Sequence, residues 1–403
     1  MSLETYKLMT LLREGAEHEL TENILPFWIA HTPDEKWGGF IGGVSHDAWR
    51  MHDEPKGAVL NARILWTFSA AWRAFGKPEY RKMAERAYSF LLSHFWDPKA
   101  EGVFWMLNAD GKPLETKKQI YAQAFALYGL AEYHRISGDR ESLDRAIRLY
   151  QLIEQHSYDP IKGGYFEAYS RHWTLLRDLR LSDKDANEKK TMNTHLHVLE
   201  AYTLLYQCWP DTGLRQKLID LTRVFLDTII DEETHHFRLF FDENWQAKSW
   251  HWSFGHDIEG SWLLCEAAEA TGDLELIHEV RAAALELACT AMKQGIDPRD
   301  GGMFNEGDAT GITDSNKHWW PQAEACVGFL NAYQLSGEDY FLRAAARSWQ
   351  YIQAHIIDRR WGEWFFSVSA EGEPDPLFVL AGPWKCPYHN GRACLELMRR
   401  VYP

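Results

Sequence analysis

The side chains best suited to chemistry stand where long apolar segments of the chain begin. Six segments open with polar or ionisable residues: Asn61 and Arg63; Tyr121 and Gln123; Asn193, His195 and His197; His256 and Glu259; Trp319, Gln322 and Glu324; and His389, Asn390 and Arg392. A buried charge or amide is costly unless it is paired. Six such clusters therefore indicate a shared polar site rather than separate accidents of packing. Histidine is well represented among them, and its ordinary pKa suits acid–base chemistry near neutral pH.

The spacing of the histidines argues against a metal site. His195 and His197 are two residues apart, so on a helix they point to nearly opposite sides and only one faces a common cavity. His256 and Glu259 are three apart and share a face, so this carboxylate either orients the imidazole or is simply structural. The pair His235-His236 is expected to be solvated in a surface turn. We expect no metal and no cofactor.

Aromatic residues surround the last of these histidines. His389 lies in Trp384-Lys-Cys-Pro-Tyr-His-Asn-Gly-Arg392, where proline fixes the approach to a helix. Trp319 and Trp384 are candidate platforms for a sugar ring, with a place in the apolar core as the alternative. The sequence contains no P-loop, no GxGxxG motif before a strand, no GxSxG and no HExxH. Nucleotide, hydride-transfer and zinc-protease chemistry therefore find no support.

A recurring turn phrase organises the whole chain. Four clear copies pair an acidic or proline-containing turn with Gly and an aromatic residue, at 33–40, 97–104, 159–166 and 297–304, and weaker copies start at Asp231 and Asp358. The phrase returns about every 65 residues, which is typical of a repeat architecture. The aromatic residues after each turn predict short extended, hairpin-like segments.

Helices of two kinds alternate around these turns. Amphipathic helices are predicted before the turns, at 79–95, 140–156, 214–230, 274–293 and 338–357. More apolar helices are predicted after them, at 61–75, 121–136, 192–208, 256–271, 320–335 and 389–401. A helix that is apolar nearly all round must be buried. We therefore expect an all-α fold, an (α/α)6 barrel in which residues 1–403 form a single catalytic domain. An open solenoid is the alternative, but no repeat looks like a polar cap.

Composition excludes several classes of partner. The 403 residues carry 43 basic and 58 acidic side chains, and a net charge of −15 disfavours nucleic acids and anionic membranes. Six scattered cysteines and the lack of a secretory signal at the N-terminus predict a reduced, cytoplasmic protein. We expect a small-molecule sugar as its partner and a monomer or weak homodimer. Tryptophan is abundant, at 19 residues, as flat sugar-binding surfaces require.

Five segments together resemble a known group of enzymes. They are Asn61–Trp66, Met192–His197, Phe254–Glu259, His318–Glu324 and Gly382–Arg392. They are similar to the cellobiose 2-epimerases of the N-acylglucosamine 2-epimerase superfamily, whose members are (α/α)6 barrels. The resemblance runs from about residue 15 to the C-terminus. It implies epimerisation at C2 of the reducing-end sugar of a β-1,4-linked disaccharide: cellobiose to glucosyl-mannose, or lactose to epilactose.

The resemblance also assigns roles to single residues. Arg63, His197, His256 and His389 match the essential residues of that group. Positions that line or support the sugar site are matched by Tyr121, Asp185, Asn193, Glu259, Trp319, Glu324 and Trp384. Epimerisation requires ring opening, loss of the C2 proton and its return on the other face. We expect His256 and His389 to be the acid–base pair, His197 to serve ring opening, and Arg63 to stabilise the enediolate.

Three other functions compete with this interpretation. An N-acylglucosamine 2-epimerase or a mannose-type aldose–ketose isomerase would share the histidines. An inverting glycoside hydrolase would need two carboxylates ~6.5–9.5 Å apart, and Glu259 and Glu324 are the obvious pair. A non-catalytic helical scaffold is the third possibility, although a scaffold has no need of buried histidines.

Overall fold

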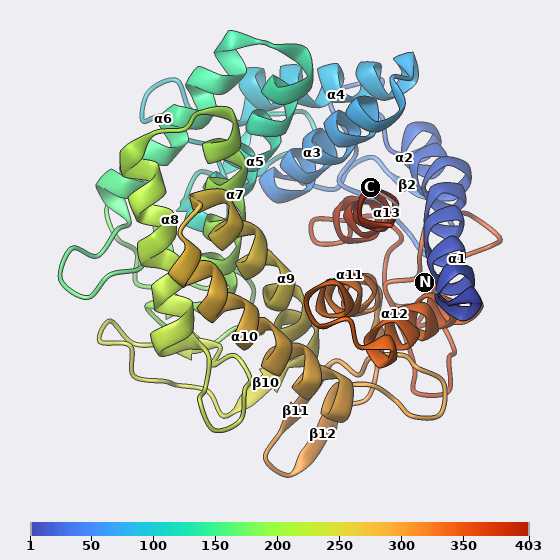
Figure 1. Cartoon of the computed structure of the whole chain (residues 1–403). Helices are drawn as coiled ribbons and strands as arrows, with labels where there is room; N and C mark the ends of the chain where they lie inside the picture. Colours follow the sequence, from blue (N-terminus) through green and yellow to red (C-terminus); the bar gives the residue numbers. More distant parts are fainter. Residues whose placement is uncertain (1, 402–403) are drawn as a thin grey trace.

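Two concentric rings of helices make up the molecule (Figure 1). The computed structural model describes residues 2–401. Each repeat contributes one inner and one outer helix, and the inner helix α13 contacts α3 and closes the ring. The predicted (α/α)6 barrel is therefore confirmed, and the open solenoid is excluded for the described residues.

The inner ring consists of apolar helices buried on nearly every side. Within residues 2–401 they are α3 (Ala58–Phe75), α5 (Ile120–Ser137), α7 (Met192–Cys208), α9 (Phe254–Thr271), α11 (Trp319–Ser336) and α13 (Tyr388–Arg400). These bounds lie within three residues of the predicted ones. Their first turns meet at one end of the barrel, which brings the starts of all six segments together.

The outer ring consists of amphipathic helices that turn their apolar stripe inward. They are α1 (Leu3–Glu19) with α2 (Leu25–His31), α4 (Pro78–Phe90), α6 (Arg140–His156), α8 (Thr212–Val224), α10 (Leu274–Thr290) and α12 (Asp339–Tyr351). Five of them continue into π-helical turns: η1 (Leu20–Ile24), η2 (Leu91–Phe95), η3 (Phe225–Ile229), η4 (Ala291–Gly295) and η5 (Ile352–Ile356).

Short caps join each inner helix to its outer partner. Gly138 and Gly272 end α5 and α9 in the left-handed conformation that glycine adopts without strain. Asp139 and Asp273 follow directly. The carboxylate of each accepts the backbone N–H of the residue three positions later and so caps the N-terminus of α6 or α10. The tight link leaves the two helices antiparallel and in contact.

Hairpins of very short strands connect consecutive repeats, as predicted. The strand before an inner helix pairs antiparallel with a strand of the next turn: β3 with β4, β6 with β7, β8 with β9, β10 with β11 and β13 with β14. Their bounds are β1 (Gly43–Val44), β2 (Arg50–Met51), β3 (Lys56–Gly57), β4 (Met106–Leu107), β5 (Pro113–Glu115), β6 (Lys118–Gln119), β7 (Ala168–Tyr169), β8 (Lys190–Thr191), β9 (Phe240–Phe241), β10 (His251–Ser253), β11 (Glu306–Asp308), β12 (Gly311–Asp314), β13 (Lys317–His318) and β14 (Ser367–Val368). A bridge between Val44 and Ala381 closes the circle.

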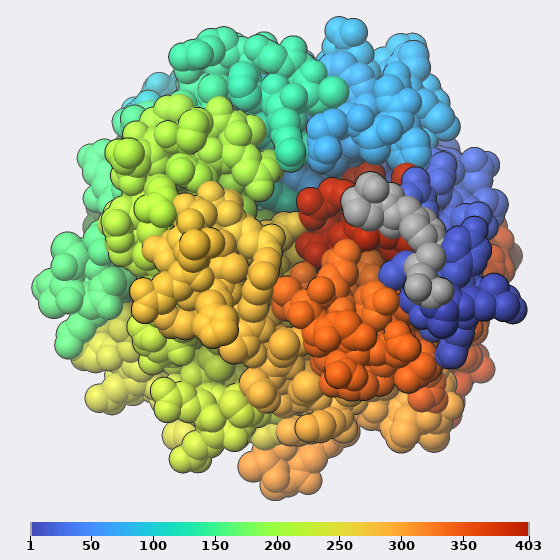
Figure 2. Space-filling model, viewed as in Figure 1, coloured from blue at the N-terminus to red at the C-terminus, as the bar shows by residue number. Residues whose placement is uncertain are grey.

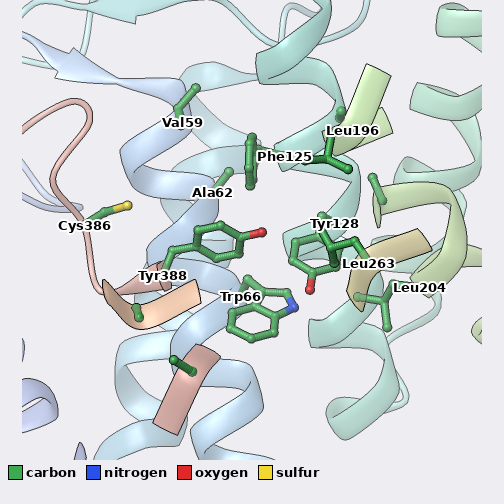
Figure 3. Packing of buried hydrophobic residues seen from close by; sticks show 14 of the residues in the cluster. Val59, Ala62, Trp66, Phe125, Tyr128, Leu196, Leu204, Leu263, Cys386 and Tyr388 are labelled. Carbon is green, nitrogen blue, oxygen red and sulfur yellow. The ribbon is translucent and has the colours of Figure 1, made fainter. Parts of the chain in front are cut away.

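Aromatic side chains fill the centre of the inner ring (Figure 3). Trp66 of α3 stacks on Tyr128 of α5, with ring centroids 5.2 Å apart, and meets Tyr388 of α13 edge-on at 5.6 Å. This layer separates the two ends of the barrel. No helix within residues 2–401 is both long enough and apolar enough to cross a membrane.

Candidate active site

The first turns of the inner helices surround a cavity of about 200 Å³. Its wall contains nine of the predicted residues: Arg63, Tyr121, Asn193, His197, His256, Glu259, Trp319, Trp384 and His389. Asn193 and His256 also line a larger cavity of about 1120 Å³ towards the β10–β12 hairpin. We call the smaller space the inner cavity and the larger one the outer cavity.

The three histidines of the inner cavity are each held at Nδ1. His197 Nδ1 lies 2.9 Å from Glu200 Oε2, and His389 Nδ1 lies 2.7 Å from Glu324 Oε1. The Glu200 carboxylate is ionised and only accepts hydrogen bonds, so Nδ1 of His197 carries the proton and Nε2 keeps its lone pair. Arg392 bonds the same oxygen of Glu324, which favours the ionised form against burial and the same tautomer in His389. His256 Nδ1 lies 2.9 Å from Ser253 Oγ. All three rings can therefore use Nε2 for chemistry.

Burial keeps two of these rings neutral. It lowers the pKa of His256 to about 3, with a smaller contribution from His197. Burial also holds the pKa of His389 well below its ordinary value, helped by the guanidinium groups of Arg63 and Arg392. A neutral imidazole is the form that accepts a proton.

Arg392 lies beneath the cavity among three glutamates. Its Nη2 is 2.5 Å from Glu259 Oε1 and 2.7 Å from Glu324 Oε1, and its Nη1 bonds Glu200. Burial raises the pKa of Glu200, but Arg392 and His197 outweigh this effect and lower it to about 2. The cluster thus supplies fixed carboxylates behind His197 and His389.

Of the two interpretations of Glu259, the structure does not show the one in which it orients His256. Glu259 turns to Arg392, and Ser253 holds His256 instead. The other oxygen of Glu259 is buried without a hydrogen-bond partner among the described residues. Burial, followed by the nearby Glu324, raises the pKa of Glu259 to about 7. This carboxyl is free to meet a hydroxyl group in the cavity.

Arg63 is a buried guanidinium without a carboxylate partner within residues 2–401. Its Nη2 donates to Tyr121 Oη at 2.8 Å, and its carbon lies 4.1 Å from the ring centroid of Phe125 and 4.6 Å from that of Tyr388. Aromatic faces therefore hold the cation without neutralising it. A positive charge of this kind favours an oxyanion in the adjacent cavity.

One cluster of two glutamates and a histidine in the site has the spacing of metal ligands. Ligand atoms of Glu259, Glu324 and His389 all lie within 4.8 Å of one another. Arg392 Nη2 bonds both carboxylates, so a cation already occupies the space between them. The donor set therefore fits a buried ion-pair cluster better than a metal ion.

The predicted aromatic platforms occupy different depths. Trp319 is buried, with its ring 4.5 Å from Phe366, while the half-buried Trp384 lies 5.9 Å from Tyr121 and 6.0 Å from Trp105. Trp384 separates the inner cavity from a side cavity of about 260 Å³. Asn193 Oδ1 is buried without a partner among the described residues.

Two of the predicted residues lie outside the inner cavity. Asp185 lines the outer cavity, where its carboxylate accepts from the backbone and hydroxyl of Ser182 at 2.8 Å. Glu324 lies behind His389 and, besides its bonds with His389 and Arg392, accepts one from Trp262 Nε1 at 3.1 Å. Asp185 is thus placed to meet a part of a ligand that projects from the inner cavity.

Several polar residues of the inner helices serve the fold. Gln123 and Gln322 each bond the backbone of the preceding turn, at Val103 and Met303. His195 takes the same position in its repeat, accepting the N–H of Tyr165 at Nε2. His195 therefore points away from the cavity and His197 points into it, as their spacing requires.

His236 is buried, so its expected place in a solvated turn is wrong. Four other repeats have glycine here, and at Gly102 a Cβ atom would lie 2.6 Å from Gln123. The fourth repeat has the shorter Asp257 in place of glutamine, which leaves room for an imidazole. His236 Nδ1 lies 2.6 Å from Asp257, and its ring stacks on Trp252 at 4.1 Å.

Sequence reasoning missed the residues that orient the histidines. Glu200 escaped notice because it lies inside an apolar helix and not at its start, and Tyr388 because it is one of several aromatic residues beside His389. The hydroxyl of Tyr388 bonds Glu200 at 2.5 Å. The spacing of three residues between His197 and Glu200 was an available signal, since such residues share a helix face. Ser253 shows the same spacing before His256.

Comparison with known proteins identifies the family of the chain. Residues 39–393 match the family model described as N-acylglucosamine 2-epimerase (GlcNAc 2-epimerase). The chain belongs to this family. The cellobiose 2-epimerase of Bacteroides fragilis is 48% identical over 389 residues, which cover 96% of this chain and 99% of that protein.

Solved structures place the chain within the N-acylglucosamine 2-epimerase family in the same way. The cellobiose 2-epimerase of Bacillus thermoamylovorans is 39% identical, with a TM-score of 0.92 over 96% of this chain and 98% of that one. A D-mannose isomerase shares the fold at a TM-score of 0.85, with 19% identity over 96% of this chain and 98% of that one.

Proposed function

We propose that this protein is a carbohydrate isomerase that inverts C2 of the reducing-end sugar of β-1,4-linked disaccharides, converting cellobiose to glucosyl-mannose and lactose to epilactose. The observation that carries the proposal is the set of three histidines around one small cavity, each with Nδ1 held and Nε2 free. The similarity to proteins named cellobiose 2-epimerase selects the disaccharide.

Ring opening is the first step of the proposed mechanism. His197 Nε2 takes the proton from the O1 hydroxyl and passes it to O5, so that the C1–O5 bond breaks and the open-chain aldehyde forms. Glu200 stabilises the imidazolium that forms, because its carboxylate accepts from Nδ1 at 2.9 Å. The aldehyde makes the C2 proton acidic.

Proton transfer at C2 follows. One of His256 and His389 removes the proton, and the other returns a proton to the opposite face of the planar enediolate. Burial lowers the pKa of both rings, so the ring that removes the C2 proton starts neutral. The ring that returns a proton carries one at Nε2, taken from water in the inner cavity before the sugar binds, and both rings exchange protons with water again after the product leaves. Arg63 stabilises the negative charge on the enediolate oxygen, because no carboxylate within residues 2–401 neutralises the positive charge of its guanidinium group. The step needs no redox cofactor.

Substrate contacts are assigned to the remaining wall residues. Trp319 and Trp384 would pack against sugar rings, and Tyr121, Asn193 and Glu259 would bond hydroxyl groups. Glu259 Oε2 and Asn193 Oδ1 support this role because both are buried acceptors without a protein donor among the described residues. Asp185 would reach the second sugar from the outer cavity, and Glu324 would act through His389.

Two alternatives have less support. A hydrolase of the inverting kind would need Glu259 and Glu324 ~6.5–9.5 Å apart, whereas both bond the same nitrogen of Arg392. Enzymes acting on N-acylglucosamine or mannose would share the histidines, and the outer cavity of about 1120 Å³ favours a larger sugar.

Product analysis tests the proposal. The protein is incubated with cellobiose, and the products are separated and identified. We expect glucosyl-mannose. Free glucose would identify a hydrolase, a ketose would identify an isomerase of the aldose–ketose type, and unchanged cellobiose with conversion of N-acylglucosamine would transfer the activity to the monosaccharide enzyme.

We further propose that the whole chain acts as one catalytic domain in the cytoplasm, as a monomer or weak dimer. Its six cysteines are unpaired, and four of them are buried in the barrel, as in a reducing compartment.

A further inference from the structure

A second cavity enters the barrel from the end opposite the candidate site. We call it the rear cavity; its volume is about 100 Å³. Arg73, Arg135, Gln207 and Arg399 line its exposed mouth, and Trp66 and Glu200 line its buried floor. Figure 2 looks onto this end of the barrel, where a recess lies near the centre between α13 in red and α9 in gold.

Glu200 forms the wall between the rear cavity and the histidines. It lines the rear cavity and not the inner cavity, while His197 lines the inner cavity and not the rear one. The hydrogen bond of 2.9 Å between His197 Nδ1 and Glu200 Oε2 therefore joins the two spaces. On the same side Glu200 also meets Tyr388 and Arg392.

The floor of the rear cavity is suited to water. Trp66 Nε1 is buried and has no hydrogen-bond partner among residues 2–401, and Trp66 stacks on Tyr128 at 5.2 Å. In Figure 3 the indole nitrogen of Trp66 lies on the side of its ring that faces Leu204 and Leu263, and both leucines line the cavity. The volume has room for about three water molecules, and carboxylate, indole and guanidinium groups offer them partners.

We propose that Glu200 and the rear cavity form a proton route between His197 and bulk water at the end of the barrel opposite the sugar. The proposal rests on the proposed function. When His197 Nε2 takes a proton from a sugar hydroxyl, the proton on Nδ1 passes to Glu200, and Glu200 passes a proton to water in the rear cavity. The sugar loses one proton and rear water gains one; the reverse sequence returns it.

This proton route is needed only while a bound sugar closes the inner cavity to water. In the free enzyme, His197 exchanges protons with water in the inner cavity. A sugar that fills this cavity of about 200 Å³ displaces that water, and the rear route then remains. Glu200 acts through His197 and does not touch the substrate.

The test uses a variant that narrows the rear cavity and leaves the residues of the inner cavity unchanged. Thr203 lies on α7 one turn after Glu200, lines the rear cavity, and donates its hydroxyl to Leu199 O. Thr203→Met adds a flexible side chain that fills the space, whereas Thr203→Val matches threonine in size and leaves it open. NMR of protein with labelled histidine reads exchange between water and the Nδ1 proton of His197, with and without saturating cellobiitol, an open-chain analogue that cannot react.

We expect wild type and Thr203→Val to keep exchanging with cellobiitol bound. Thr203→Met should exchange normally when free but at least about ten-fold more slowly when cellobiitol is bound, since positioned proton-transfer partners contribute at least that much. Equal exchange in all three proteins with cellobiitol bound would overturn the route. Slow exchange in Thr203→Met that is the same with and without cellobiitol would also overturn it.

A crystal structure of the sugar-free protein gives an independent test. Ordered water should bridge Glu200 or Trp66 Nε1 to the mouth of the rear cavity, and a dry cavity would overturn the route. If cellobiitol fails to shift the resonances of His256 and His389, the proposed function fails instead, and the ordered water still decides the route.

Discussion

At the scale of single residues, the two-base assignment of His256 and His389 makes an asymmetric prediction. Replacing either by alanine should lower epimerisation by ~10²–10⁴-fold, the usual contribution of general acid–base catalysis. The remaining histidine can still remove and return a proton on its own face. In heavy water, one variant should therefore place deuterium at C2 of the gluco sugar alone, and the other at C2 of the manno sugar alone.

NMR or mass spectrometry of recovered sugars measures this exchange. Wild type should carry solvent deuterium at C2 of the product. Product without deuterium would mean that a single shielded base transfers the same proton, and two fully active alanine variants would remove both residues from the mechanism.

His195 provides a contrast to its neighbour His197. Burial lowers its pKa to about 3, so the unfolded chain gains a proton below pH 6.5 that the folded chain does not. The free energy of unfolding should therefore fall on acidification from pH 6.5 towards pH 3, by about 1.4 kcal/mol per pH unit from this residue.

His195→Gln should remove that share of the pH dependence and keep the activity. Glutamine already occupies the equivalent position at Gln123 and Gln322, where it bonds the preceding turn. Denaturant unfolding at pH 7 and pH 5 measures the difference between variant and wild type. An inactive, well-folded variant would show that His195 takes part in the chemistry.

At the scale of structural elements, the turn before α13 differs from the others. Four repeats have glycine at its last position, but the sixth has Glu363, in a left-handed conformation with φ 67°. Its carboxylate accepts from Lys385 Nζ at 2.5 Å, Asn390 Nδ2 at 2.6 Å and Trp28 Nε1 at 2.5 Å. Glu363 thus ties the segment that carries His389 to the N-terminal helices.

We expect Glu363 to position His389 as well as stabilise the fold. Glu363→Gly leaves Lys385 buried and unpaired, which should cost about 3–5 kcal/mol of stability. Adding Lys385→Met removes the second charge and should restore most of the stability. Because Asn390 and Trp28 still lack their partner, kcat should remain about ten-fold or more below wild type, as small misplacements of catalytic groups cause.

The double variant separates the two roles of Glu363. Thermal unfolding reports the fold, and kcat and KM report the site. Recovery of kcat together with stability would mean that Glu363 serves the fold alone. His236 is the other residue at this turn position that is not glycine, and His236→Gly is the matched control. It should leave kcat unchanged, because the hydrogen bonds of the His236 side chain go only to Asp257 and Gln294.

At the scale of the whole molecule, the ring closes where the first helix meets the last turn. Glu19 Oε1 of α1 accepts from Trp364 Nε1 at 2.8 Å and from Asn23 Nδ2 at 2.5 Å. Burial raises the pKa of Glu19 to about 7, against the bonds from Asn23 and Trp364. The folded chain therefore holds a proton that the unfolded chain loses above pH 4.5.

This closure should weaken as the pH rises from about 4.5 through 7. Glu19→Gln keeps the acceptor oxygen for both donors and removes the ionisation. Its stability should match wild type near pH 5 and exceed it at pH 8.5 by about 2–3 kcal/mol. Thermal unfolding at both pH values measures the effect, and equal stability of the two proteins at pH 8.5 would contradict it.

The sequence by itself determined the repeats, the helices and most of the cavity wall. An amphipathic and an apolar helix alternate about every 65 residues. This pattern allows few arrangements of the helices, because a helix that is apolar all round must be surrounded by other helices. The inner helices all begin at the same end of such a barrel. The polar residues at these helix starts were therefore expected to converge, and the resemblance to the cellobiose 2-epimerases singled out Arg63, His197, His256 and His389 among them.

Only the tertiary structure decided which groups bond one another. Spacing allowed Glu259 to orient His256 or to be structural. Arg392, which lies 133 residues after Glu259 in the chain, bonds that carboxylate because a buried guanidinium needs a counter-charge. His236 lies inside because Asp257 of the next helix is short enough to admit it. Glu200 meets both a histidine and a rear cavity because six helices converge there. Such contacts join residues far apart in the chain, and local periodicity carries no information about them.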